Sequence, residues 1–227
     1  MNSTLRFLLF SLLFLLNGYL LHGQDTSRLR ILEWQSLFPL RQGQQVTQSE
    51  NKIFYIASQS IVSIDKSDFS MEQFDKSSGL SDVKLKFIQF NSFRKELIIA
   101  YQDGVFDIMD QKGKVVSLPQ IRNFKNFTGD KSINQLYLAA GDLLLIATQY
   151  GVSALNLAKR EFSFSVFTGL PVKNVILHKG FIYAATEKGL YRIEANHANP
   201  ENFNNWKWLT IQDGFPSGFC SAHPACG

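Results

Sequence analysis

Two cysteines and a histidine near the end of the chain are residue types that can bind a metal ion. Cys220, His223 and Cys226 lie in the stretch CSAHPACG, and the 227-residue sequence has no other cysteine. Their spacing matches no standard zinc pattern, and a fourth ligand is missing. A local disulfide formed after export, or a tail outside the fold, explains them better. We therefore predict no metal site and no cofactor.

Three aspartates in the stretch DGVFDIMD could supply oxygen ligands to calcium. Asp103, Asp107 and Asp110 do not follow the alternation of ligands found in calcium-binding loops. We expect Asp103 to lie in a turn, Asp107 to point outward from a strand, and Asp110 to begin the next turn. Turn formation by aspartate accounts for this pattern without a metal.

Three histidines could serve as general bases, namely His178, His197 and His223. None has a carboxylate and a nucleophile at a recognisable spacing. The members of a triad need only meet in space, so the sequence leaves that alternative open. No catalytic residue is assigned, and we expect the chain not to be an enzyme.

Four aromatic residues could stack on sugars, namely Trp34, Phe203, Trp206 and Trp208. Packing inside the fold is the favoured interpretation, because aromatic side chains dominate protein cores. The sequence assigns no ligand-binding residue.

The first 24 residues resemble an export signal. Arg6 precedes the apolar run FLLFSLLFLL, which is too short to span a bilayer of about 30 Å as a helix. Small and polar residues then follow up to Gly23, as in a cleaved signal peptide. The predicted organisation is a signal peptide over 1–24, a folded region over 25–219 and an atypical tail over 220–227.

The composition is that of a globular protein, with 45% apolar and 19% charged residues. Removing residues 1–24 removes one arginine and no acid, so the formal net charge falls from +4 to +3. The basic residues are scattered and form no dense run, which argues against nucleic-acid binding.

One hairpin pattern occurs four times in the folded region. The copies are IFYIASQSIVSID from Ile53, LIIAYQDGVFDIM from Leu97, LLIATQYGVSALN from Leu144 and IYAATEKGLYRIE from Ile182. An alanine near the end of each first strand aligns them, at Ala57, Ala100, Ala147 and Ala185. Their spacing is near 40 residues and the apolar alternation has period two, which is typical of β-propeller blades. Three copies end their turn with a glycine (Gly104, Gly151 and Gly189), a residue suited to a left-handed conformation, and the first copy requires a different turn.

A second motif lies between the hairpins, as SGLSDVKLKFI from Ser78, TGLPVKNVIL from Thr168 and DGFPSG from Asp213. The apolar run after it is expected to form an innermost strand buried on both faces. For one blade we predict strands over 83–90, 96–101, 105–109 and 114–118, and for the next over 133–139, 143–148, 152–157 and 161–167. A further outer strand is expected over 31–38, with a linker running to Val46. A closed ring of four blades is the alternative to an incomplete ring, although DGFPSGF indicates a fifth blade.

Several of these stretches also resemble a known family. SGLSDV, AYQDG, TGDKSIN and NFNNW occur in the order and spacing found in the amino-terminal propeller of PorZ-type proteins, components of the type IX secretion system of Bacteroidetes. The likeness runs from about Leu32 to Phe219. It implies an all-β fold of four-stranded antiparallel blades, four of them present, in an incomplete seven-bladed ring.

The resemblance also implies a function. It predicts a non-catalytic binding or scaffold protein of the attachment machinery, exported to the periplasm or the outer-membrane surface. The implied partners are a sortase, other attachment-complex proteins and anionic lipopolysaccharide. The alternative is the sensor ectodomain of a hybrid two-component regulator, which uses similar blades.

Overall fold

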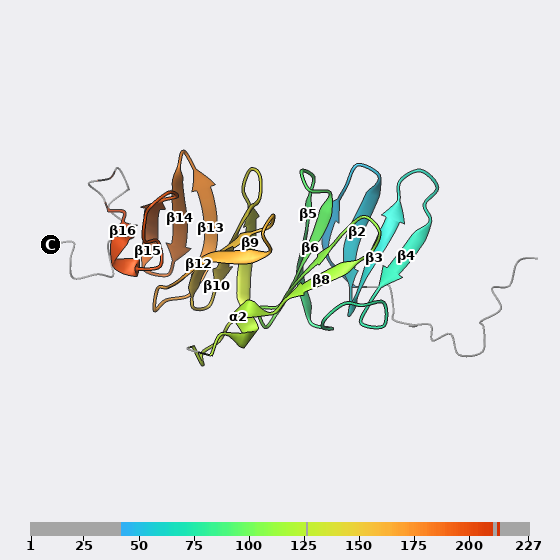
Figure 1. The fold of residues 1–227 in the computed structure, drawn as a ribbon, viewed down its shortest axis with the longest axis horizontal. Helices are drawn as coiled ribbons and strands as arrows, with labels where there is room; N and C mark the ends of the chain where they lie inside the picture. The colour runs from blue at the N-terminus through green and yellow to red at the C-terminus, as the bar shows by residue number, and fades with distance from the viewer. Residues whose placement is uncertain (1–41, 126, 211–212, 214–227) are drawn as a thin grey trace, which may run out of the picture. The chain divides into compact units, whose positions relative to one another are not determined.

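The computed structural model describes residues 42–125, 127–210 and 213, and its strands form four antiparallel sheets of four strands each (Figure 1). Each sheet consists of consecutive strands, and we number the sheets as blades 1 to 4. Blade 1 contains β1 (Gly43–Gln48), β2 (Lys52–Ala57), β3 (Ser60–Asp65) and β4 (Met71–Phe74). Blade 2 contains β5 (Leu85–Asn91), β6 (Glu96–Tyr101), β7 (Phe106–Met109) and β8 (Val115–Leu118). Blade 3 contains β9 (Ile133–Leu138), β10 (Leu143–Thr148), β11 (Gly151–Asn156) and β12 (Glu161–Phe167). Blade 4 contains β13 (Val172–His178), β14 (Phe181–Thr186), β15 (Gly189–Glu194) and β16 (Lys207–Trp208). The predicted all-β fold of four-stranded propeller blades is confirmed.

The predicted strands of blades 2 and 3 agree with the structure to within two residues at every boundary, and β6, β10 and β12 have the predicted bounds. Strand β1 begins at Gly43, earlier than the expected end of the linker at Val46. The expected strand over 31–38, the signal segment, the tail with its cysteines and most of DGFPSGF lie outside the described residues.

Blade 2 buries apolar side chains on both faces of its sheet. On β6, Leu97 and Ile99 belong to the core that blade 2 shares with blade 1. The alternate residues Ile98 and Ala100 belong to the core that blade 2 shares with blade 3. Because side chains alternate along a strand, one strand contributes to both cores.

Blade 3 repeats this arrangement between blades 2 and 4. On β10, Leu144 and Ile146 face blade 2, whereas Leu145 and Ala147 face blade 4. All four side chains have no exposed surface. Burying a leucine or isoleucine fully is worth about 1.5–3 kcal/mol, so the contacts between blades supply much of the stability of each sheet.

The strands that are buried on both faces are the middle strands, which corrects the expectation for the innermost ones. Strand β6 is buried over five of its six residues, whereas β5 alternates between buried and half-buried positions. An innermost strand has a neighbouring strand along one edge only, so its side chains are less covered.

Polar side chains on innermost strands join neighbouring blades. The Gln45 side-chain oxygen accepts a hydrogen bond from the backbone N–H of Ile88 at 2.6 Å, which links blades 1 and 2. The Gln135 side-chain oxygen accepts from the backbone N–H of Val175 at 3.0 Å, which links blades 3 and 4 in the same manner. These bonds satisfy backbone donors that have no strand partner on that side.

Each blade makes extensive contact with the next blade along the chain. Within the described residues, blades 1 and 4 make no such contact with each other, which argues against a small closed ring. Ile176, whose cross-strand neighbour is Tyr183, is 45% exposed, as expected for a fourth blade with one uncovered face.

The hairpin turns follow the sequence prediction, except that the first hairpin is shifted by one residue relative to the other three. The turn glycines have positive φ angles, at Gly104 (84°), Gly151 (150°) and Gly189 (126°). In the first hairpin, Ser58 takes a φ of 55° in a two-residue turn between Ala57 and Ser60. With this shorter turn, Ile56 joins the core that faces blade 2 and is the counterpart of Ala100. The alignment of Ala57 with Ala100 is therefore wrong by one residue.

Asp107 is fully buried, which corrects the expectation that it points outward. Its carboxylate accepts hydrogen bonds from the Ser81 backbone N–H (2.8 Å), the Ser81 hydroxyl (2.6 Å) and the Tyr101 hydroxyl (2.6 Å). Burial, together with the bond to Asp107, raises the pKa of Tyr101, so this phenol keeps its proton. Ser81 lies in the linker before blade 2, so the buried carboxylate fastens that linker to the blade.

We predict that Asp107→Asn destabilises the fold by about 1–3 kcal/mol, because the neutral amide offers one acceptor oxygen where the carboxylate offers two, so the hydrogen bonds to a charged acceptor are lost. Urea denaturation of both proteins measures the difference in unfolding free energy. The control is Ser117→Ala, which removes a 2.7 Å hydrogen bond between the Ser117 and Ser81 hydroxyls at an exposed position. An Asp107→Asn protein as stable as the control would show that the buried carboxylate is not needed.

Candidate binding site

The connection between blades 2 and 3 is the longest of the three blade linkers. It covers residues 119–132, compared with 75–84 before blade 2 and 168–171 before blade 4. It contains the short helix α2 (Gln120–Asn123), labelled in Figure 1. Long connections of this kind commonly carry function on a rigid scaffold.

Helix α2 is fixed against blade 2 by one apolar and one charged contact. Ile121 is buried against the β6–β7 turn, where a Cβ atom on Gly104 would lie 2.5 Å from the Ile121 Cγ2 atom. Only a glycine at this position allows such a close approach. Arg122 forms ion pairs with Asp103 at 3.2 Å and with Asp82 at 3.5 Å. The turn position predicted for Asp103 is confirmed, and its carboxylate anchors the linker.

Lys131 holds the end of the helix from the other side. Its ammonium group donates hydrogen bonds to the backbone carbonyls of Arg122 at 2.9 Å and Phe124 at 2.7 Å. Cations near the end of a helix satisfy carbonyl groups that lack a partner in the helix. The lysine therefore sets the path of the chain at Phe124.

Four aromatic rings gather where this linker meets blade 3. Phe167, at the end of β12, has its ring centre 5.5 Å from Phe124, 5.2 Å from Phe127 and 5.1 Å from Tyr150. Phe127 and Tyr150 are also 5.5 Å apart. Phe124 is 41% exposed and Phe167 is 38% exposed, so the cluster presents ring surface to solvent. We call these four residues the ring cluster.

The β10–β11 turn places Tyr150 beside Phe167. The backbone carbonyl of Tyr150 accepts a hydrogen bond from the Thr168 N–H at 3.0 Å. A Cβ atom on Gly151 would lie 2.0 Å from the Val166 carbonyl oxygen, so glycine is required for the two segments to approach this closely. The glycine that ends this hairpin turn thus also positions two rings of the cluster.

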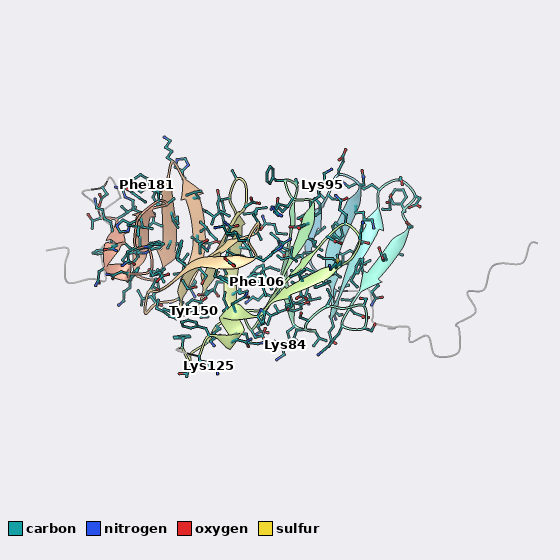
Figure 2. The ribbon with its side chains drawn as sticks, viewed as in Figure 1. Lys84, Lys95, Phe106, Lys125, Tyr150 and Phe181 are labelled. Carbon is teal, nitrogen blue, oxygen red and sulfur yellow. The ribbon has the colours of Figure 1, made fainter. Side chains whose placement is uncertain are left out.

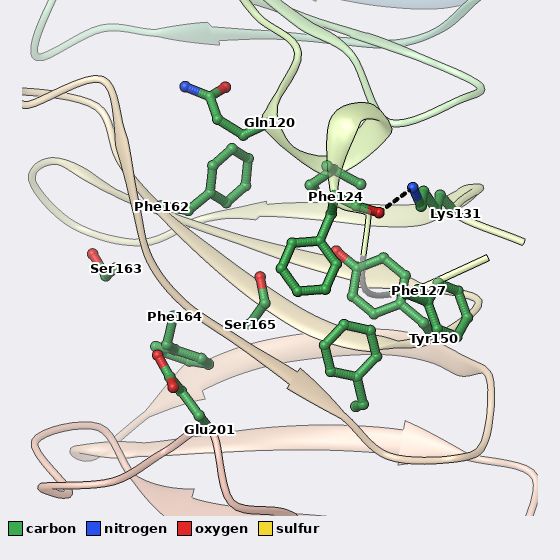
Figure 3. Close-up of a pocket in the computed structure, with 12 residues that line it drawn as sticks. Gln120, Phe124, Phe127, Lys131, Tyr150, Phe162, Ser163, Phe164, Ser165 and Glu201 are labelled. Carbon is green, nitrogen blue, oxygen red and sulfur yellow. Dashed lines mark hydrogen bonds between the residues drawn. The ribbon is translucent and has the colours of Figure 1, made fainter. Parts of the chain in front are cut away.

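Two cavities border the ring cluster. One, of about 450 Å³, is also lined by Phe162, Ser163, Ser165 and Glu201, and Figure 3 shows these side chains with Lys131 at its edge. The other, of about 510 Å³, is also lined by Gln149 and Gly169. Both volumes are in the range of small-molecule sites.

Hydroxyl groups beside the first cavity are joined in a chain, and Gln120, Lys131 and Glu201 also line the cavity. The Tyr150 hydroxyl lies 2.7 Å from the Ser153 hydroxyl, which lies 2.7 Å from that of Ser165. Burial raises the pKa of Tyr150, so it stays neutral. The Lys131 ammonium is bound to carbonyls, and Glu201 also lines this cavity, so the arrangement offers aromatic surface and hydrogen-bonding groups to a ligand.

The histidines considered from sequence do not enter this site. His178 is exposed at the end of β13, and His197 accepts a hydrogen bond from the Asn199 N–H at 3.1 Å; neither lines the two cavities. His223 lies outside the described residues. Asp110 accepts hydrogen bonds from the N–H groups of Lys112 and Lys114, which confirms its role in a turn.

The part of the chain that the structure describes contains no group of three or more His, Cys, Asp or Glu side chains that could hold a metal ion. None of its helices is long and apolar enough to cross a membrane.

The aromatic residues singled out from sequence pack inside blade 4. Trp206 is buried and its indole N–H donates to the Pro200 carbonyl at 3.0 Å. Phe203, in the 3-10 helix η1 (Phe203–Asn205), lies 4.9 Å from Tyr191 and 6.4 Å from Trp206. The packing interpretation is confirmed for these two residues. Trp208 lies against Gly189, and Trp34 is outside the described residues.

Sequence reasoning missed the ring cluster. The available signal was NFKNF, over Asn123–Phe127, because two phenylalanines in a long polar linker need an apolar surface to cover them. No comparable signal marks Tyr150 or Phe167, since an aromatic residue at either position also fits the end of an ordinary strand.

We predict that Lys131→Met speeds backbone hydrogen exchange in residues 120–125 by about tenfold, because charged hydrogen bonds to carbonyls contribute about 1.5–3 kcal/mol each before rearrangement. Exchange followed by mass spectrometry on the variant and the parent protein measures this effect.

Lys125→Met is the matched control, since Lys125 is exposed in the same linker. Equal exchange in the two variants would contradict the role given to Lys131.

Comparison with solved structures relates the chain to other propellers. PorZ of Porphyromonas gingivalis, a bacterial surface component of the type IX secretion system, is 25% identical with a TM-score of 0.71, over 78% of this chain and 24% of that one. The chain thus spans about a quarter of the PorZ chain that it matches.

Two further structures show the fold alone. The extracellular domain of the putative hybrid two-component system BT4673 from B. thetaiotaomicron is 14% identical with a TM-score of 0.58, over 74% of this chain and 22% of that one. AztD of Citrobacter koseri is 12% identical with a TM-score of 0.54, over 71% and 45% of the two chains.

Comparison with curated protein sequences gives no match. The family described as the amino-terminal β-propeller domain of PorZ, of the type IX secretion system, matches residues 53–207, from β2 to β16. This match covers more than half of the sequence and confirms the resemblance seen in its motifs. The chain belongs to the family of PorZ amino-terminal β-propeller domains.

Proposed function

We propose that this chain is a non-catalytic binding component of the type IX secretion attachment machinery, exported to the periplasm or the outer-membrane surface. Family membership and the similarity to PorZ, itself a surface component of that system, support this assignment. A sortase and other attachment proteins are the proposed protein partners, and anionic lipopolysaccharide is the proposed ligand.

The ring cluster is the observation that carries the ligand proposal. Phe124 and Phe167 are stacked with an interplanar angle of 24° and remain partly exposed beside a cavity. Aromatic faces of this kind stack on the apolar faces of sugar rings, while the hydroxyls of Ser163 and Ser165 offer hydrogen bonds to sugar hydroxyls. Lys131 and Glu201 bring one positive and one negative charge to this cavity, so the choice of an anionic glycan rests on the family resemblance and not on the charge of the site.

The sensor-ectodomain alternative has weaker support. The similarity to BT4673 is in the fold alone, whereas the similarity to PorZ also includes a family match over residues 53–207. The two proposals differ in what the chain is expected to bind. Glycan binding at the ring cluster and binding to attachment proteins would favour the attachment-machinery proposal over the sensor proposal.

We predict that the double substitution Phe124→Ala and Phe167→Ala weakens binding of the polysaccharide from anionic lipopolysaccharide roughly tenfold, since a stacked aromatic contact is worth about 0.5–1.5 kcal/mol. Isothermal titration calorimetry measures both affinities. The parent affinity is expected to be weak, because the site draws on two blades and one linker.

Phe69→Ala is the matched control, because Phe69 is 76% exposed on a turn of blade 1 and lines neither cavity. Polysaccharide binding that survives the double substitution would remove the ring cluster from the proposal. Failure of the parent chain to bind the polysaccharide would contradict the proposal that anionic lipopolysaccharide is the ligand.

We also predict that the purified chain does not turn over lipopolysaccharide, peptidoglycan or casein, since no nucleophile, base and orienting group meet at the described cavities. Product analysis after prolonged incubation tests this. Reproducible turnover that one substitution abolishes would overturn the non-catalytic assignment.

A further inference from the structure

A third cavity lies between blades 1 and 2 at the opposite end of their strands. Its volume is about 700 Å³, larger than either cavity at the ring cluster. It is lined by the β1–β2, β5–β6 and β7–β8 turns, whereas the ring cluster lies at the end that carries the blade linkers. In Figure 2, Lys95 and Tyr150 mark these two ends. The two sites are therefore separate.

The floor of this cleft is apolar. The rings of Phe54 and Phe90, one from each blade, stack at 6.0 Å with an interplanar angle of 11°. Phe74, Leu97 and Met109 complete the floor and belong to the core between the two blades. The floor is therefore packed into the core and presents an apolar surface to the cleft.

Two of the lysines on the rim of the cleft have a bonding partner among the described residues, and two do not. Lys52 is paired with Glu72 at 3.4 Å, and the Lys66 ammonium donates to the neutral oxygens of Ser49 and Gln48. Lys95 and Lys112 are exposed, and no hydrogen bond or ion pair joins their ammonium groups to another described residue. Both belong to blade 2, so one wall of the cleft presents two unpaired positive charges.

The lining of the cleft carries four lysines and three carboxylates, so its formal charge is positive. Asp110 lies in the same turn as Lys112 and accepts hydrogen bonds from the backbone N–H groups of Lys112 and Lys114, at 2.8 and 3.0 Å, and its negative charge offsets part of the positive charge of blade 2. Glu72 is paired with Lys52 across blade 1. Glu50 lies on the opposite side of the cleft, on the β1–β2 turn. A ligand that presents acidic groups to blade 2 and an apolar group to the floor matches this distribution.

We propose that the cleft between blades 1 and 2 binds an acidic peptide segment of a partner protein, with an apolar side chain on the Phe54–Phe90 floor and carboxylates beside Lys95 and Lys112. The charge arrangement supplies the selectivity for acidic sequences, and the recessed floor supplies an anchor of the kind that dominates peptide interfaces. A recessed floor favours a peptide side chain over a flat membrane surface, which contacts protruding groups.

The test uses the full chain and two fluorescein-labelled peptides, EELFEE and its neutral counterpart QQLFQQ, in fluorescence anisotropy titrations. We expect EELFEE to bind more tightly, and its affinity to fall as the salt concentration rises, because exposed charges are screened. The double variant Lys95→Gln and Lys112→Gln is expected to weaken EELFEE binding roughly three- to tenfold, which is the effect of losing two exposed ion pairs.

A second variant tests the cavity itself without changing charge. Ser92→Trp places a large ring at the exposed rim and is expected to weaken EELFEE binding at least as much as the double lysine variant. The control is Lys159→Gln with Lys188→Gln, two exposed lysines on turns of blades 3 and 4, which is expected to leave the affinity unchanged. Circular dichroism and thermal unfolding establish that each variant is folded.

Three outcomes would overturn the proposal. They are equal binding of the two peptides, unchanged EELFEE binding in both cleft variants, and no detectable peptide binding. A parallel sedimentation assay with phosphatidylglycerol vesicles covers the membrane alternative. Vesicle binding that depends on Lys95 and Lys112, without peptide binding, would assign the cleft to lipid instead. None of these results depends on the ring cluster, so they leave the proposed glycan site untouched.

Discussion

A four-stranded sheet with apolar side chains on both faces is stable only when other sheets cover both faces, and this requirement organises the whole described structure. Consecutive side chains on β6 and β10 point alternately into two different cores. Blades 2 and 3 therefore each contribute one face to the core with the preceding blade and one to the core with the next. The side-chain oxygens of Gln45 and Gln135 accept hydrogen bonds from backbone N–H groups of the next blade, which fixes the position of one blade against the other more precisely than apolar packing alone.

The same requirement explains where the two proposed binding sites lie. Side chains fill the space between blades, so ligands can enter only at the strand ends, where turns and linkers diverge. At one end, the long linker between blades 2 and 3 brings Phe124 against Phe167 and is fixed there by Lys131. At the other end, the turns of blades 1 and 2 stand apart above the Phe54–Phe90 pair.

The repeated part of the structure was predictable from sequence, and the unique part was not. Period-two alternation and turn glycines such as Gly104 predict strands and turns because they reflect local backbone geometry. The burial of Asp107 escaped prediction because alternation distinguishes two faces of a strand, and here both faces are covered. The ring cluster escaped because Phe124 and Phe167 lie far apart in the sequence and meet only through the folded linker. The family resemblance identified the fold, but it assigned no ligand residue.

Mutual dependence of the blades can be tested by hydrogen exchange on Ile146→Ala. Ile146 lies on blade 3, has no exposed surface and faces blade 2. Truncating a buried isoleucine to alanine costs about 2–5 kcal/mol. If neighbouring blades stabilise one another, the slowly exchanging amides of β6 and β7 in blade 2 should lose protection together with those of β10 and β11 in blade 3. Loss of protection confined to blade 3, with blade 2 unchanged, would contradict this account.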